Sequence, residues 1–162
     1  MLPGWDGQAR GLFPLPRFCE PDPPVFRLED QLRVVLAQEG LLEATNPAFA
    51  SEYEGNVEID NPISLEESYL RSSLLPALLR NVEYNFARGS RDIRLFEIGT
   101  VFQGADVGDP PQEALHVGVA LTGRQRPSHW SERDNLVDFW DLKGILEATV
   151  AASGWGETSL ST

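Results

Sequence analysis

The chain has 162 residues, 41% of them hydrophobic, which suits a single domain with a sizeable core. Its 25 acidic and 13 basic side chains give a formal charge of −12, which opposes non-specific nucleic-acid binding because that binding needs cations to displace counterions from phosphates. No apolar run approaches the about 20 residues of a membrane span, no signal peptide is apparent, and the single Cys19 excludes an internal disulfide, so we expect a cytoplasmic chain without a membrane partner.

The first part of the chain predicts an extended arm followed by a helix. Residues 1–24 hold six prolines and three glycines without periodicity, which is typical of a linker or arm. A helix is predicted over Phe26–Glu39, because prolines precede it, Gly40 ends it and apolar residues recur on one face. This face consists of Leu28, Leu32, Val35 and Leu36. It covers either the chain's own sheet or a partner.

Two extended segments follow. Leu41–Ala50 predicts a strand, with Pro47 at a sheet edge or a strand end because proline has no N–H to donate. Val57–Ile63 predicts a second, shorter segment that contains turn residues at Asp60, Asn61 and Pro62.

A second helix is predicted over Leu74–Ala87. Ser72 or Ser73 can cap it, and Pro76 lies in its first turn, where a missing N–H costs nothing. Its apolar residues form a stripe along one face, as is typical of a helix that packs on a core, and this stripe consists of Leu75, Leu78, Leu79, Val82 and Phe86.

The rest of the chain predicts a hairpin and a last helix. Ile93–Gln103 and Ala114–Leu121 are typical of strands, and the Gly-, Pro- and Asp-rich segment between them favours an antiparallel hairpin with a long loop. Asp138 can cap a helix that Gly154 ends, with residues 156–162 as a tail. This order predicts an α+β fold with a mostly antiparallel sheet. Because at most four strands are visible and sheets average about five or six, we expect the sheet to continue beyond Thr162.

Four motifs in a fixed order carry a family resemblance. NPIS from Asn61, LRSSLLPALL from Leu70, LFEIGTVF from Leu95 and DFWDLKG from Asp138 together resemble the phenylalanyl-tRNA synthetase beta chain over residues 20–155. The resemblance implies that residues 25–155 form part of a catalytic-like module with a class II synthetase fold. It also implies a fragment, since the family's beta chain is several times longer.

Residues Gly40–Phe49 resemble the first class II motif, which builds a subunit interface in that family. The resemblance implies interface use of a set that spans the first helix and this segment, namely Leu28, Leu32, Val35, Leu36, Pro47 and Phe49.

The predicted hairpin resembles the second class II motif, but without its catalytic side chains. The family pattern Phe-Arg-x-Glu falls on Phe102 to Ala105, so that Gln103 takes the place of the Arg and Ala105 that of the Glu. No Lys or Arg occurs from Leu95 to Gly123, and a neutral amide cannot replace a bidentate guanidinium on phosphate. We also find no third class II motif. We therefore expect no catalytic residue and no bound cofactor here, with ATP and Mg belonging to the holoenzyme only. With one Cys and no spaced pair of His, we also expect no metal site.

The resemblance implies a structural role. The module is expected to support the alpha subunit, which ligates phenylalanine to tRNA(Phe) with ATP in a heterotetramer, and to meet tRNA(Phe) only through the holoenzyme. Two alternatives stay open. One is an active class II ligase domain, and the other is an RNA-binding module that uses the basic residues from Arg80 to Arg94, with contacts at Arg88, Arg91 and Arg94. For Arg71 we expect an ion pair with Glu67 or Asp60.

Overall fold

The computed structural model describes residues 23–104, 110–126, 128–131 and 134–154. The predicted tail and all but the last two residues of the predicted arm lie outside this part of the chain. The elements follow in the order α1 (Pro24–Gln38), β1 (Leu42–Glu43), β2 (Phe49–Ala50), β3 (Gly55–Glu58), β4 (Tyr69–Arg71), α2 (Leu75–Ala87), β5 (Ile93–Gln103), β6 (Gln112–Thr122) and α3 (Phe139–Ser153). The helices of the described ranges fall short of the length and apolarity that crossing a membrane requires.

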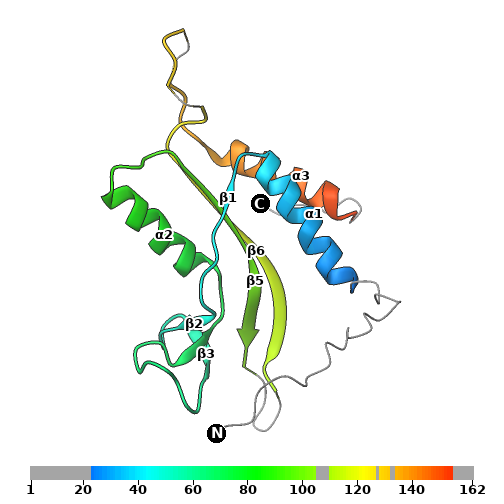
Figure 1. Ribbon diagram of the computed structural model, residues 1–162, viewed down its shortest axis with the longest axis vertical. Coiled ribbons are helices and arrows are strands. Elements are labelled where there is room, and N and C mark those ends of the chain that lie inside the picture. Colours follow the sequence, from blue (N-terminus) through cyan, green and yellow to red (C-terminus); the bar gives the residue numbers. More distant parts are fainter. Residues whose placement is uncertain (1–22, 105–109, 127, 132–133, 155–162) are drawn as a thin grey trace, which may run out of the picture.

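A three-stranded sheet lies between two helical layers. Its order is β1–β5–β6, with α2 on one face and α1 and α3 on the other (Figure 1). β5 and β6 form the predicted antiparallel hairpin, which pairs from Ile93 opposite Thr122 to Gln103 opposite Gln112. β1 runs parallel to β5. A second, antiparallel sheet with the order β2–β4–β3 lies at one end, so the α+β prediction is confirmed.

The face of the sheet toward α1 and α3 carries one half of the core. Phe96 of β5 is buried there with Leu36 of α1 and Ile145 of α3. The last helix forms where predicted because its ends are capped. The Asp138 side chain accepts from Trp140 N and Asp141 N, and Gly154 ends the helix with a positive φ of 72°.

The opposite face packs on α2, which lies closer to β6 than a side chain would allow. A Cβ at Gly118 would meet the Leu78 side chain at 2.8 Å. Leu74 and Leu78 of α2 are buried there with Val101 of β5. The glycine therefore sets the distance between α2 and the sheet.

The predicted core-facing stripe of α2 is only partly right. Leu78 is fully buried, whereas Leu75, Leu79 and Phe86 are exposed. α2 is turned so that Asn81 faces the sheet, because the Asn81 Nδ2 donates a hydrogen bond of 3.0 Å to Asn46 Oδ1.

The predicted strand over residues 41–50 is instead two strands of two residues each, in different sheets. After β1, Ala44 N still donates to Phe96 O at 2.7 Å. Asn46 N then donates to the Glu97 side chain at 3.4 Å, so the ladder with β5 ends there. The chain leaves the central sheet and pairs Phe49 with Leu70 of β4, a strand that we did not predict.

Candidate functional site

A buried ion pair lies on the α2 face of the central sheet. Arg71, the last residue of β4, reaches across to Glu97 of β5, and its Nη1 donates to Glu97 Oε1 at 2.6 Å. The two residues expose only 7% and 2% of their surface. The expected partners of Arg71, Glu67 and Asp60, are wrong, because β4 points the guanidinium inward to β5 rather than back along its own loop.

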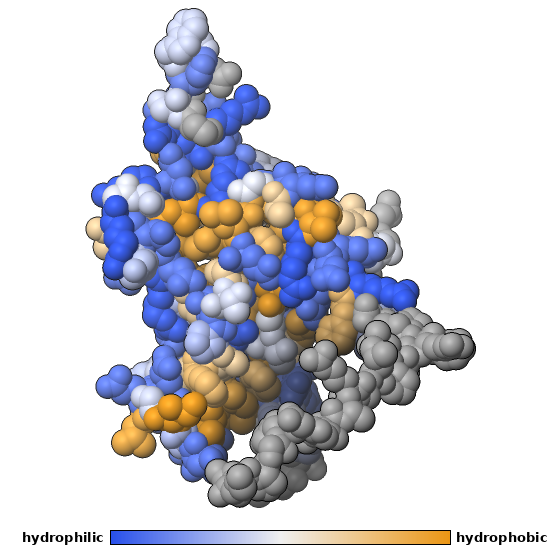
Figure 2. All heavy atoms as spheres, in the orientation of Figure 1, coloured by the Kyte–Doolittle hydropathy of each residue, from blue (hydrophilic) through white to orange (hydrophobic). Residues whose placement is uncertain are grey.

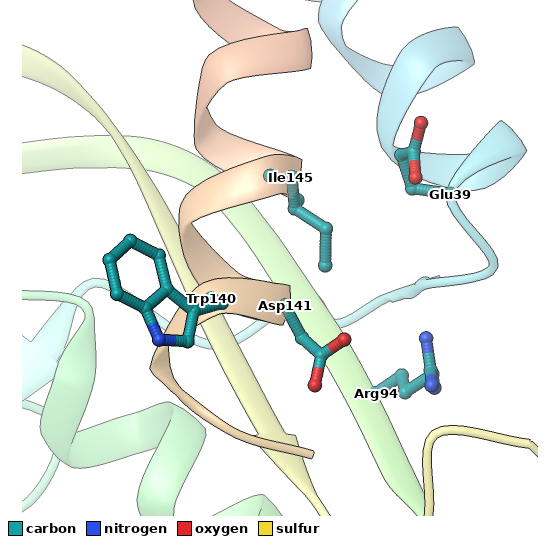
Figure 3. A pocket seen from close by; sticks show the side chains of 6 residues that line it. Glu39, Arg94, Trp140, Asp141 and Ile145 are labelled. Atoms are coloured by element: carbon teal, nitrogen blue, oxygen red, sulfur yellow. The ribbon is translucent and has the colours of Figure 1, made fainter.

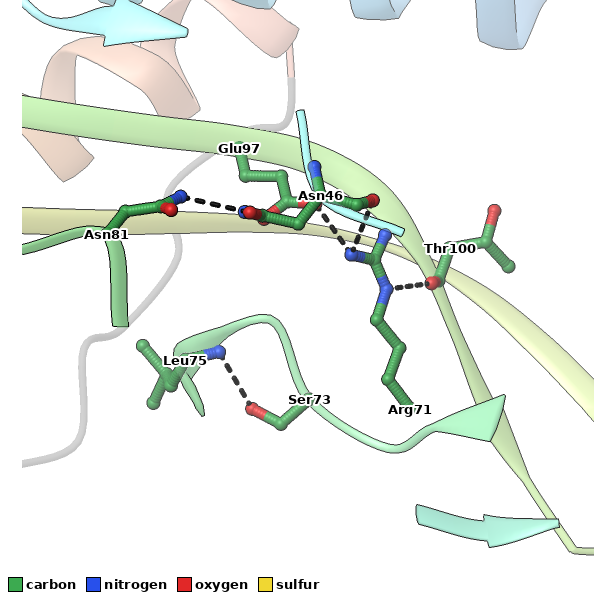
Figure 4. A network of polar contacts seen from close by, with 7 residues as sticks. All are labelled: Asn46, Arg71, Ser73, Leu75, Asn81, Glu97 and Thr100. Carbon is green, nitrogen blue, oxygen red and sulfur yellow. Dashed lines mark hydrogen bonds and ion pairs between the residues drawn. The ribbon is translucent and has the colours of Figure 1, made fainter. Parts of the chain in front are cut away.

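Neighbouring segments supply further hydrogen bonds to this pair (Figure 4). Arg71 Nε donates to Thr100 O at 3.0 Å, and Nη1 lies 3.4 Å from Asn46 O. Glu97 Oε2 accepts from Asn46 Nδ2 at 2.7 Å. We call Asn46, Arg71, Asn81, Glu97 and Thr100 the buried network. In the described residues, no buried side-chain nitrogen or oxygen is left without a partner.

The buried network carries no net charge. The positive charge of Arg71 is matched by Glu97, and a Cβ at Gly99 would overlap the guanidinium, so the backbone of β5 lies directly against it. A phosphate would have to compete with Glu97 for this guanidinium. The arrangement therefore joins β4, β5, α2 and the segment that follows β1, and the charge of Arg71 is already paired.

One sequence signal pointed to Glu97. It is the only charged residue in the segment from Leu95 to Phe102, which is otherwise apolar apart from Gly99 and Thr100. A lone acid in such a strand requires a buried partner of opposite charge. The sequence did not reveal which arginine supplies it, because Arg71 lies 26 residues away.

Gln103 lies at the exposed end of β5. It pairs with Gln112 of β6, and the neighbouring Phe102 pairs with Glu113. Ala105 lies outside the described residues. The position that resembles the phosphate-binding Arg of the second class II motif thus carries a neutral amide, with a carboxylate on the adjoining residue of the partner strand.

A cavity of about 260 Å³ lies on the other side, between α3 and the start of β5 (Figure 3). Arg94 donates there to Gln125 O, and Gln125 Nε2 donates to Asp141 at 2.9 and 3.1 Å. Hydrogen bonds from Gln125 and from the backbone of Asp138 lower the pKa of Asp141. These contacts hold the loop after β6 on the first turn of α3, which leaves Asp141 occupied as a capping group.

The arginines of the predicted basic cluster each have a partner of their own. Arg94 turns to Gln125, and Arg80 pairs with Glu54 at 2.6 Å. The guanidinium carbon of Arg88 lies 3.2 Å from the centre of the Tyr84 ring, and that of Arg91 lies 4.1 Å from the Phe86 ring. RNA contact by Arg88, Arg91 and Arg94 stays a prediction, and only Arg88 and Arg91 are exposed for it.

The residues predicted for a subunit interface lie in three environments. Leu32 and Leu36 are buried in the chain's own core, Leu28 and Val35 are half-buried, and Pro47 and Phe49 are exposed. The interface itself stays a prediction. A partner could reach Pro47 and Phe49 directly, whereas Leu32 and Leu36 already pack inside this chain. The described residues hold no group of three or more His, Cys, Asp or Glu side chains arranged for a metal ion.

Comparisons with known proteins agree with this architecture. Residues 19–161 match the family model described as the phenylalanyl tRNA synthetase beta chain CLM domain. The chain is 38% identical over 140 residues to the phenylalanine–tRNA ligase beta subunit of Protochlamydia amoebophila (strain UWE25), covering 78% of this chain and 17% of that protein. It is 44% identical over 101 residues to the same subunit of Xylella fastidiosa (strain 9a5c), covering 62% of this chain and 13% of that protein. The chain thus spans a small part of these relatives.

The fold is shared with solved synthetase structures. A pyrrolysyl tRNA synthetase from Desulfitobacterium hafniense, PylSc, superimposes with a TM-score of 0.63 at 20% identity, over 86% of this chain and 49% of the other. A second structure of the enzyme from that organism gives a TM-score of 0.64 at 21% identity, over 86% and 50%. This likeness shows a class II synthetase fold.

Proposed function

The chain belongs to the phenylalanyl-tRNA synthetase beta chain family, and from this we propose that it is a structural, non-catalytic module of the beta subunit of phenylalanine–tRNA ligase. In this proposal the alpha subunit activates phenylalanine with ATP and transfers it to tRNA(Phe). The module docks on the alpha subunit and helps to fix a cytoplasmic heterotetramer. ATP, Mg and tRNA(Phe) belong to the holoenzyme.

The observation that carries the proposal is that the Arg71 guanidinium is already paired with Glu97. Adenylate formation needs positive charge placed at the reacting phosphorus centre. On the α2 face, Arg71 is held by Glu97 at 2.6 Å, lies against the backbone of β5 at Gly99 and exposes only 7% of its surface. From residue 95 to residue 123 the hairpin supplies no other cation. These residues do not fit a polyphosphate.

The missing positive charge is informative because the chain has a class II fold. The hairpin β5–β6 is present with its register complete, so the scaffold is kept while Gln103 replaces the cation at its end. A folded hairpin without phosphate-binding groups supports a scaffolding role over an active ligase domain.

The proposal is tested by nucleotide binding and by exchange of pyrophosphate into ATP. The purified beta subunit, without alpha, should give no heat on ATP titration and no phenylalanine-dependent exchange above background. The reconstituted alpha–beta enzyme is the positive control. Exchange by beta alone would show that a phosphate-binding cation comes from a position that we have not identified, and it would overturn the proposal.

A further inference from the structure

Large apolar side chains project from one end of the molecule. We call residues 51–67, which form β3 and the loops on both sides of it, the acidic tip. Tyr53, Ile63 and Leu65 of this tip are 96%, 94% and 89% exposed, and Phe49 beside it is 40% exposed. Figure 2 shows hydrophobic residues gathered over the β2–β4–β3 sheet, at the lower left. Apolar surface gathered in this way is typical of an interaction site.

The same segment carries one sign of charge. Between residues 51 and 67 there are six carboxylates and no Lys or Arg, namely Glu52, Glu54, Glu58, Asp60, Glu66 and Glu67. Arg80 pairs with Glu54, at the side of the tip that faces α2. Burial and the charges of Glu58 and Glu52 raise the pKa of Tyr69, at the base of the tip. The charge of the tip repels phosphate and attracts a basic surface.

Hydrogen bonds hold the tip to the residues that follow it and within its last turn. Ser72 donates to Glu54 O from its N at 3.1 Å and from its Oγ at 2.7 Å. Ile59 N donates to Ser68 O at 2.8 Å, and Glu66 N donates to Ser64 Oγ at 3.2 Å. These bonds fix residues on both sides of Ile63 and Leu65, and a segment that is already held in place binds with a smaller loss of conformational freedom.

We propose that the acidic tip is a surface through which the module docks on the alpha subunit, where Ile63 and Leu65 enter an apolar pocket rimmed by Lys and Arg. This inference rests on the proposed function, since it names the contact surface of a module whose role is to hold the alpha subunit. The apolar side chains supply the buried area, and the carboxylates steer and orient the encounter.

The first test removes the apolar contacts from the full-length beta subunit. The double variant Ile63→Ser/Leu65→Ser should weaken alpha–beta association at least tenfold by sedimentation equilibrium. The matched control Leu136→Ser removes an apolar side chain that is 70% exposed outside the tip, and it should change association less than twofold. Unchanged association in the double variant, or an equal loss in the control, would overturn the proposal.

The second test reverses charge. Glu66→Lys/Glu67→Lys should lower the alpha–beta association rate constant about tenfold at low salt, with the difference shrinking at high salt as screening increases. The control Glu83→Lys/Glu147→Lys makes the same charge change on exposed positions of α2 and α3. Equal rate losses in both variants would indicate an effect of net charge alone and would overturn the assignment to the tip.

The third test identifies the occupant. A photo-crosslinking amino acid at Leu65 in the assembled holoenzyme should label a segment of the alpha subunit that is rich in Lys or Arg. Labelling of another part of the beta subunit, or of added tRNA, overturns the inference and leaves the proposed function intact. Nucleotide binding by the beta subunit alone has the opposite effect, because it contradicts the proposed function and leaves the docking surface untouched.

Discussion

Arg71 and Glu97, from different sheets, form an ion pair of 2.6 Å that is almost fully shielded from water. Charges in such an environment are costly unless each is paired and hydrogen-bonded. Here Asn46 and the Thr100 carbonyl complete the pair. The small sheet β2–β4–β3 is thereby fixed to the central hairpin.

Removing one member of this pair should be strongly destabilising. We expect Glu97→Ala to lower the free energy of unfolding by about 3–5 kcal/mol, since it leaves the Arg71 guanidinium buried without its counter-charge. The double variant Arg71→Met/Glu97→Leu should recover most of that loss, because no charge then remains buried. Urea unfolding followed by circular dichroism measures both. Glu147→Gln, at an exposed i,i+4 pair with Lys143, should cost about 0.5 kcal/mol or less. If Glu97→Ala is no worse than this control, the pair does not fix the two sheets.

Two glycine substitutions should have opposite effects on stability. A Cβ at Gly99 would overlap the Arg71 guanidinium, so Gly99→Ala should displace the ion pair and cost about 1–3 kcal/mol. A Cβ at Gly144, within α3, meets nothing within 4 Å. Gly144→Ala should therefore stabilise the chain by about 0.5–1 kcal/mol, because alanine loses less conformational freedom in a helix. Thermal unfolding of both variants measures whether the first loses stability and the second gains it. A stabilising Gly99→Ala would contradict the position of Arg71.

The sequence predicts the elements whose signals are local. The bounds of β5 are those expected from its apolar pattern, and α3 begins and ends at the capping residues Asp138 and Gly154. β4 was missed because three residues carry little local signal, and its pairing with β2 and β3 depends on the rest of the fold.

The orientation of α2 about its own axis could also not be predicted from the spacing of its apolar residues. Its apolar residues favour burying Leu75 and Leu79, but the contact between Asn81 and Asn46 and the close approach at Gly118 turn these leucines outward. At the candidate site, the missing cation at Gln103 is readable from the sequence. The ion pair between Arg71 and Glu97 cannot be predicted from the sequence, because it joins two segments that only the folded chain brings together.

Acid should weaken the fold partly through Asp92. Hydrogen bonds from the side chain and the backbone of Arg124 lower the pKa of Asp92 below the usual 3.8. A carboxylate with a lowered folded pKa contributes stability above its unfolded pKa and loses it as the pH falls through the folded value. Asp92→Asn should therefore be less stable than wild type at pH 7, and the difference should shrink below about pH 3.8.

Unfolding midpoints measured from pH 7 to pH 2.5 test this linkage. Glu83→Gln, on the exposed side of α2, is the control and should follow the wild-type curve. A constant difference between Asp92→Asn and wild type at every pH would show that the carboxylate's charge is not the source of the effect.

Restoring a cation at the end of β5 should not create an active site. Gln103→Arg places a guanidinium beside Gln112 and close to Glu113, at an exposed position where water and a carboxylate compete with phosphate. Arg71 stays paired with Glu97 in this variant, so it cannot act on phosphate together with the new arginine. We expect no phenylalanine-dependent exchange of pyrophosphate into ATP above the background of the wild-type beta subunit, with Gln112→Arg as a matched control. Exchange that appears with Gln103→Arg and not with Gln112→Arg would mean that one side chain separates this module from a working ligase, and that the buried network does not exclude catalysis.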